Sequence, residues 1–158
     1  MSDFLMSCSC RGRRPKHVAS SATHSRPHLI ADLLRSRDVA RFLVAPTGFG
    51  KSTVAAEYAQ VVFSFRQTFW VNCESPCFLR DLDAGIIASR VAEIGGAGSL
   101  VVFDDLPRMD ASRVEVFSEV VDELLAAGSE VLVTCTPTCD AYSDLHRDRV
   151  KLSARRFL

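Results

Sequence analysis

The sequence has no long apolar run, no net charge and no internal repeat. Its 158 residues include 19 basic and 19 acidic side chains, so the formal net charge at pH 7 is zero. A balanced charge gives no reason to expect nucleic acid or a membrane surface as a partner. No stretch approaches the roughly 20 apolar residues of a membrane span, and the N-terminus MSDFLMSCSC has no basic residue ahead of its apolar patch, as a signal peptide would. We therefore expect a cytoplasmic protein that does not contact the membrane.

Length and composition are typical of one globular domain. Hydrophobic residues make up 47% of the chain and charged residues 24%, which suits a single core. Residues 1–25 are rich in serine, arginine, histidine and cysteine without periodicity, which predicts a mobile basic tail before a domain at residues 26–158. The six cysteines do not show the tight, repeated spacings of structural zinc sites, and we expect reduced thiols.

Apolar segments of strand length alternate with segments of helical periodicity. Strands are predicted at 41–45, 68–72, 100–103 and 130–134, with a fifth at 149–153. Helices are predicted from Pro27, over 54–65, over 79–94, and from an N-cap at Asp110 to Gly128. Continuously apolar strands separated by helices favour an α/β fold of three layers, a mostly parallel sheet of about five strands with helices on both faces. Ligands of such sheets bind beyond the carboxyl ends of the strands.

The segment APTGFGKST, residues 45–53, lies between the first predicted strand and the helix that follows it. It matches the phosphate-binding pattern G-x-x-x-x-G-K-[ST], with an alanine in place of the first glycine. Its glycines allow the backbone N–H groups to converge on an anion at the helix N-terminus. The lysine is placed to reach terminal phosphates, the serine to bind Mg²⁺ and the last threonine to bond an inner phosphate. We predict that a nucleotide is bound by Ala45, Pro46, Thr47, Gly48, Phe49, Gly50, Lys51, Ser52 and Thr53.

An acidic pair ends the third predicted strand. In SLVVFDD, four apolar residues are followed directly by Asp104 and Asp105. A charge at the end of a buried strand is unusual in a protein core. In nucleotide hydrolases, however, a carboxylate at this place holds Mg²⁺. We assign Asp104 to the Mg²⁺ shell, together with Ser52, and Asp105 to polarising the attacking water. The candidate catalytic residues are Lys51, Asp104 and Asp105.

With both motifs placed, the chain resembles P-loop NTPases of the additional-strand type, and more narrowly the STAND ATPases. It is similar to the N-terminal ATPase module of the large LuxR-type transcription regulators, the group that includes the maltose-regulon activator. The stretches SRPHLIADLL, LVAPTGFGKSTV, SLVVFDDLPRM and VKLSARRFL carry this resemblance and frame residues 25–158. It implies ATP and Mg²⁺ as ligands, slow hydrolysis that resets a switch, and self-association in the ATP-bound state. It also implies that residues 26–29 lie near the base and ribose.

Three features depart from that family. After the fourth strand such ATPases often carry a phosphate-sensing arginine, where VTCTP offers only Thr134 and Thr136. The segment between the second and third predicted strands is shorter than we expect for that family. The sequence ends at Leu158, where helical, sensor and DNA-binding helix-turn-helix domains would follow. We therefore expect an isolated or truncated nucleotide-binding module without a DNA-binding element.

Three functions remain open from the sequence. The first is an ATP-dependent switch in signalling or transcription regulation. The second is a small P-loop kinase, which needs an arginine-rich lid over the phosphates; the late arginines available for it are Arg147, Arg149, Arg155 and Arg156. The third is a non-catalytic domain that binds a protein partner and that nucleotide only stabilises. ATP is favoured over GTP by the resemblance alone.

Overall fold

The computed structural model describes residues 10–11, 25–63, 67–94, 96–139 and 149–158. None of the helices in these ranges is long and apolar enough to cross a lipid bilayer. The strands are β1 (Cys10–Arg11), β2 (Ala40–Val44), β3 (Thr68–Asn72), β4 (Leu100–Asp104), β5 (Glu130–Cys135) and β6 (Arg149–Ser153). The helices are α2 (Pro27–Leu34), α3 (Lys51–Tyr58), α4 (Phe78–Asp83), α5 (Ile86–Ile94) and α6 (Ala111–Ala126), with short turns η1 (Ala59–Phe63), η2 (Pro137–Cys139) and η4 (Ala154–Phe157).

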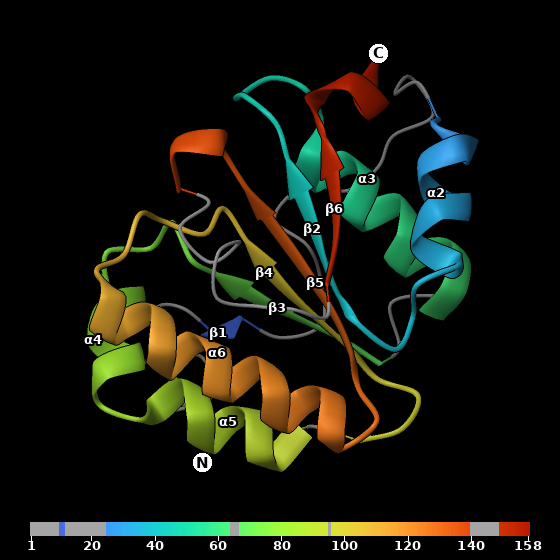
Figure 1. The fold of residues 1–158 in the computed structure, drawn as a ribbon. Coiled ribbons are helices and arrows are strands. Elements are labelled where there is room, and N and C mark those ends of the chain that lie inside the picture. The colour runs from blue at the N-terminus through green and yellow to red at the C-terminus, as the bar shows by residue number, and fades with distance from the viewer. Residues whose placement is uncertain (1–9, 12–24, 64–66, 95, 140–148) are drawn as a thin grey trace.

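The strands form one sheet in the order β1-β3-β4-β5-β2-β6 (Figure 1). Neighbours from β3 to β6 are parallel, and only the two-residue β1 pairs antiparallel, with β3. The predicted mostly parallel sheet of about five strands is confirmed, and β1 is a sixth strand that the sequence did not indicate. Because Val44 is paired with Cys135, the ends of β2 and β5 lie side by side at the carboxyl edge of the sheet.

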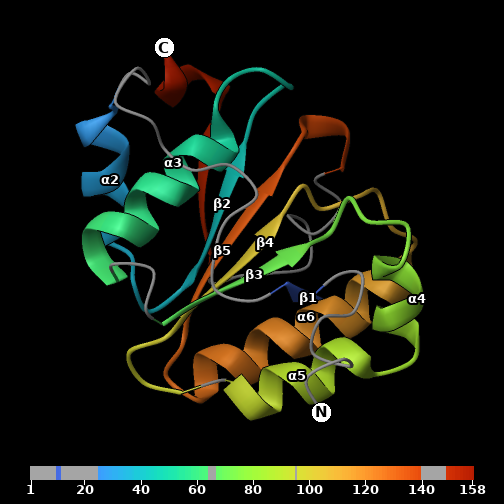
Figure 2. The same cartoon turned by 180° about the vertical axis from the view of Figure 1, so that it is seen from behind.

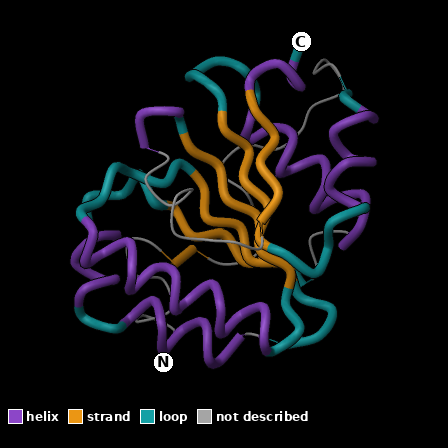
Figure 3. Tube along the Cα trace, viewed as in Figure 1, coloured by secondary structure: helices purple, strands orange, loops and turns teal. Residues whose placement is uncertain are grey.

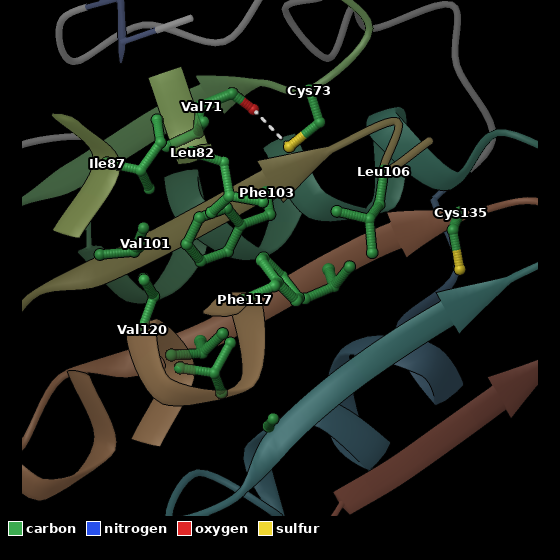
Figure 4. Packing of buried hydrophobic residues seen from close by; sticks show 14 of the residues in the cluster. Val71, Cys73, Leu82, Ile87, Val101, Phe103, Leu106, Phe117, Val120 and Cys135 are labelled. Atoms are coloured by element: carbon green, nitrogen blue, oxygen red, sulfur yellow. Dashed lines mark hydrogen bonds between the residues drawn. The ribbon is translucent and has the colours of Figure 1, made fainter. Parts of the chain in front are cut away.

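Helices cover both faces of the sheet, which confirms the three-layer architecture. Helices α2 and α3 lie on one face and α4, α5 and α6 on the other (Figures 1 and 2), with the strands between the two groups (Figure 3). Each interface has its own apolar cluster. In the cluster under α4–α6, the rings of Phe103 and Phe117 meet edge to face at 4.9 Å between centroids (Figure 4), a favourable geometry for aromatic pairs.

Two helices differ from the sequence-based expectation. The single helix expected over 79–94 is divided into α4 and α5 at Gly85, whose φ of 75° lies outside the helical region. The helix expected over 54–65 leaves α-helical geometry after Tyr58 and continues as the π-helical turn η1. The expected cap is confirmed, because the carboxylate of Asp110 accepts a hydrogen bond from the Arg113 N–H at 2.9 Å.

The cysteines fall in two states among the residues described. Cys73, Cys135 and Cys139 are outside any disulfide. Cys73 follows β3 and Cys135 ends β5, and β4 separates these two strands, as expected. Cys77 is disulfide-bonded, so the expectation of reduced thiols is wrong for this residue. A sequence does not reveal which two sulfurs the fold brings within bonding distance.

Candidate functional site

The loop at residues 45–50 rises from the carboxyl edge of the sheet and turns directly into α3. Its start is fixed because the Ala45 N–H donates to the carbonyl oxygen of Cys135, on the neighbouring strand, at 3.2 Å. Gly48 and Gly50 have φ of 91° and 84°, left-handed conformations that favour glycine. Gly50 is the N-cap of α3, and its carbonyl accepts the helix bond from the Val54 N–H at 3.0 Å. This is the strand–loop–helix context that an anion-binding loop needs.

The loop borders a pocket of about 330 Å³. This volume is at the lower end of the range usual for small-molecule sites and suits the phosphate tail of a ligand. Among the nine predicted contact residues, Ala45 is buried in the apolar cluster under α2 and α3, and Phe49 packs against this cluster. The pocket brings most of the others together with one of the acidic pair; its lining is Thr47, Gly48, Gly50, Lys51, Ser52, Thr53 and Asp105.

Lys51 is folded back into its own loop. Its Nζ donates to the carbonyl oxygen of Pro46 at 3.2 Å, and the residue is only 6% exposed. A buried ammonium needs hydrogen-bond acceptors, and one carbonyl satisfies one of its three donors. A phosphate oxygen in the pocket could serve as a further acceptor, at the positive end of α3.

The two candidate Mg²⁺ ligands lie in direct contact. Ser52, in the first turn of α3, donates to Asp104 Oδ1 at 2.7 Å, and Asp104 is only 4% exposed. A hydroxyl and a carboxylate are the oxygen ligands that Mg²⁺ accepts, beside water and phosphate. The residues present therefore fit a magnesium site between α3 and the end of β4.

Thr134 is a site residue whose role the sequence did not reveal. Its side chain is fully buried at the end of β5, and it donates to Asp104 Oδ1 at 2.7 Å. The same hydroxyl oxygen accepts from the Asp105 N–H at 2.8 Å. The sequence identified Thr134 only as a residue present where an arginine is often found. Its contact with the acidic pair follows from the order of the strands, since β5 lies beside β4.

Asp105 has an uncommon backbone conformation, with φ of 58°. Left-handed geometry in a residue other than glycine costs about 1–3 kcal/mol and persists where the surroundings hold it. The hydrogen bond to Thr134 is such a restraint. It fixes the chain at the turn that brings Asp105 into the pocket lining.

Arg26 also reaches the loop. Its Nη1 donates to the carbonyl oxygen of Phe49 at 2.6 Å. It fills the space beside Gly50, where a Cβ atom would lie 2.8 Å from this nitrogen. The sequence associated residues 26–29 with the base and ribose through the family resemblance, and gave no signal for a contact with the loop at residues 45–50.

The fold has a solved counterpart. Over 87% of this chain and 92% of the other, the structure is similar to the DnaC helicase loader, with a TM-score of 0.55 and 12% sequence identity. The chain has the P-loop NTPase fold.

Two other solved P-loop NTPase structures are similar over a smaller part of their length. The Pif1 helicase from Candida albicans matches with a TM-score of 0.49 at 12% identity, over 85% of this chain and 40% of that one. PCH-2 from C. elegans matches with a TM-score of 0.43 at 14% identity, over 80% and 40%. No family model and no curated protein matches the sequence. The narrower resemblance to STAND ATPases stays a prediction.

The two glycines of the loop at residues 45–50 can be compared by alanine substitution. Gly48→Ala is expected to lower the free energy of unfolding by about 1–2 kcal/mol, the cost of left-handed backbone in an L-residue, since its Cβ would meet open space. Gly50→Ala carries the same strain and also displaces Arg26, so its loss is expected to be larger. Urea unfolding of both variants measures the difference. A larger loss at Gly48 would contradict the geometry.

Proposed function

We propose that the chain is an ATP-binding, slowly hydrolysing P-loop module that acts as a nucleotide switch in signalling or transcription regulation. The observation that carries the proposal is the 2.7 Å contact between Ser52 and Asp104 beneath the loop. It joins the two motifs that a nucleotide hydrolase needs, a phosphate loop and an acidic strand end, at the place where the metal would be held.

Each residue of the site has a definite part in this proposal. Backbone N–H groups of the loop and the Lys51 ammonium bind the phosphates. Ser52 and Asp104 hold Mg²⁺, which when bound neutralises negative charge on the phosphate oxygens. Asp105, which lines the pocket, orients and polarises a water for attack on the terminal phosphate.

The kinase alternative has less support from the late arginines. Arg156 forms an ion pair with Asp32 of α2, and Arg149 lies over the ring of Phe42 at 6.0 Å. Arg155 is exposed on η4, and Arg147 lies outside the described residues. Within the described ranges, none of these arginines lines the pocket, as a lid over the phosphates would.

One observation favours the non-catalytic alternative: near the end of β5 stands a threonine and not an arginine. Thr134 stands near the place of the sensing arginine, and its hydroxyl already bonds the acidic pair. A site with this arrangement can bind nucleotide without fast turnover. Measuring phosphate release separates the functions: release without an acceptor supports the switch, release only with an added acceptor the kinase, and tight binding without release the partner-binding domain.

Protein partners or self-association in the ATP-bound state belong to the same proposal. They rest on the resemblance to STAND ATPases. The DnaC helicase loader, by its name, acts on another protein, but a similarity at 12% identity concerns the fold. We propose no contact with DNA for this chain.

Thermal unfolding with Mg-ATP, Mg-ADP and Mg-GTP tests nucleotide binding directly. Mg-ATP at about 100 times its dissociation constant is expected to stabilise the protein by about 2.7 kcal/mol, because only the folded state binds it. The shift is expected to disappear in Lys51→Ala and to remain in Arg155→Ala, which removes an exposed cation from η4. A folded protein without any nucleotide-dependent shift would contradict the proposal, and an equal shift with Mg-GTP would contradict the choice of ATP.

A further inference from the structure

Arg26 connects the phosphate loop to the turn η4 near residue 158. Its Nη1 donates to the Phe49 carbonyl at 2.6 Å, and its Cζ lies 5.4 Å from the centroid of the Phe157 ring. Phe157 is only 5% exposed, so its ring offers Arg26 a largely desolvated surface. Cation–π contacts are strongest under those conditions. One side chain thus bridges two segments far apart in the sequence.

The hydrogen bond to Phe49 determines how the next amide is oriented. No described peptide bond is cis, and in a trans peptide the carbonyl and the following N–H point in opposite directions. When Arg26 holds the Phe49 carbonyl, the Gly50 N–H is directed away from Arg26. Gly50 lines the pocket, whereas Arg26 does not. The contact therefore turns a carbonyl away from the place of the phosphates, where its negative end would repel them, and an N–H donor toward it.

Arg26 is itself held in place by two elements. Its carbonyl accepts from the Leu29 and Ile30 N–H groups at 3.0 and 3.2 Å, and both residues anchor α2 in the core. Helix α2 is in turn joined to η4: His28 Nε2 bonds the Arg156 carbonyl at 2.6 Å, and the Arg156 guanidinium pairs with a carboxylate of α2. This arrangement keeps Phe157 against Arg26.

We propose that Arg26 is a positioning residue that orients the Phe49–Gly50 peptide toward the nucleotide phosphates, and that η4 sets its position through Phe157. The inference rests on the proposed function, since it requires the loop to bind phosphate. The competing role for Arg26 is a direct contact with the base or ribose. The two roles differ in one respect: a positioning residue affects every ligand with the same phosphates, whether or not it carries a nucleoside.

Calorimetric titration with Mg-ATP and with inorganic tripolyphosphate plus Mg²⁺ tests the proposal. Arg26→Met keeps the apolar stem and removes the guanidinium, and it is expected to weaken both ligands by about tenfold, the effect of losing one charge-assisted hydrogen bond. Phe157→Leu keeps an apolar side chain at the buried position and is expected to weaken both by about threefold. Arg155→Met removes an exposed charge from the same turn and is expected to change neither.

The outcomes are distinguishable. A loss of ATP affinity with unchanged tripolyphosphate affinity in Arg26→Met would overturn the proposal in favour of a base or ribose contact, and no change with either ligand would overturn it as well. If Arg26→Met does not fold, as judged by circular dichroism, Phe157→Leu decides by the same comparison. If the wild-type protein binds neither ligand, or binds both with the same affinity as Lys51→Ala, the proposed function itself fails.

Discussion

Arg41→Met is expected to lower the free energy of unfolding by about 3–5 kcal/mol, the usual cost of removing one partner of a buried ion pair. Arg41 is fully buried, and its Nη2 pairs with Glu130 Oε1 at 2.9 Å. Its Nη1 donates to the Leu33 carbonyl at 2.7 Å and to the Tyr58 hydroxyl at 2.9 Å. Methionine fills a similar volume but leaves the Glu130 carboxylate and these acceptors without the guanidinium.

The neighbouring groups reinforce this dependence. Burial raises the pKa of the Tyr58 phenol, partly offset by the charge of Arg41, and the hydrogen bond to Glu130 raises it further. The phenol therefore stays protonated and donates to Glu130 Oε1 at 2.5 Å, but this neutral donor does not supply the positive charge that the substitution removes. Arg37 also pairs with Glu130, at 2.6 Å, but its side chain is 45% exposed.

Urea unfolding of matched variants measures the effect. Arg37→Met is expected to cost at most about 1 kcal/mol, because exposed ion pairs contribute little. The double variant Arg41→Met with Glu130→Met is expected to be more stable than Arg41→Met alone, since it leaves no buried carboxylate that has lost its buried partner. A loss below that of Arg37→Met in the Arg41 variant would contradict the described network.

Asp104→Asn is expected to weaken the Mg²⁺-dependent part of ATP binding by about 100-fold or more, because losing even a group that only orients a metal ligand costs about 10–100-fold. The substitution keeps the shape of the side chain and removes its charge. The amide oxygen of asparagine can take the place of Oδ1 and accept the same hydrogen bonds from Ser52 and Thr134. The effect is therefore expected on the metal rather than on the fold.

Thr134→Val and Thr134→Ser test whether the Thr134 hydroxyl orients the acidic pair, because neither substitution changes a charge. The valine variant removes the hydroxyl that holds both members of the acidic pair, and it is expected to weaken Mg²⁺-dependent binding by about 10–100-fold. The serine variant keeps the hydroxyl and is expected to restore most of the affinity. Titrations of ATP with Mg²⁺ and with EDTA give the metal-dependent part. Equal affinities with and without Mg²⁺ in the wild type would contradict the metal site.

Local patterns in the sequence predicted most of the architecture. The strands at RVKLS and TFWVN and the cap at Asp110 depend on residues close together in the chain, and the structure confirms them. The loop at residues 45–50 also depends on consecutive residues, and the structure places it between β2 and α3 as predicted; its binding of phosphate stays a prediction. The break at Gly85 could not be inferred, since the apolar periodicity continues across it from 79 to 94.

Contacts between distant segments were not predictable in the same way. The bond between Thr134 and Asp104 requires knowing that β5 lies beside β4. An arginine at the start of a strand ordinarily lies in solvent, whereas Arg41 is buried where Glu130, from a strand much later in the sequence, pairs with it. The approach of Arg26 to Phe49 depends on the packing of α2 beside α3. These contacts are properties of the assembled sheet and helices.

The position of β2 in the sheet has a consequence for how the protein folds. Its neighbours are β5 and β6, so Arg41 finds its strand partners at Leu132 and Val150, late in the chain. The strands β3 and β4, by contrast, pair across one short pair of helices. Bringing the ends of a long segment together costs chain entropy before the strand contacts form, and this cost slows folding. During synthesis β2 is made before β5 and β6, so we expect the edge of the sheet that carries the loop at residues 45–50 to be among the last parts of the domain to form.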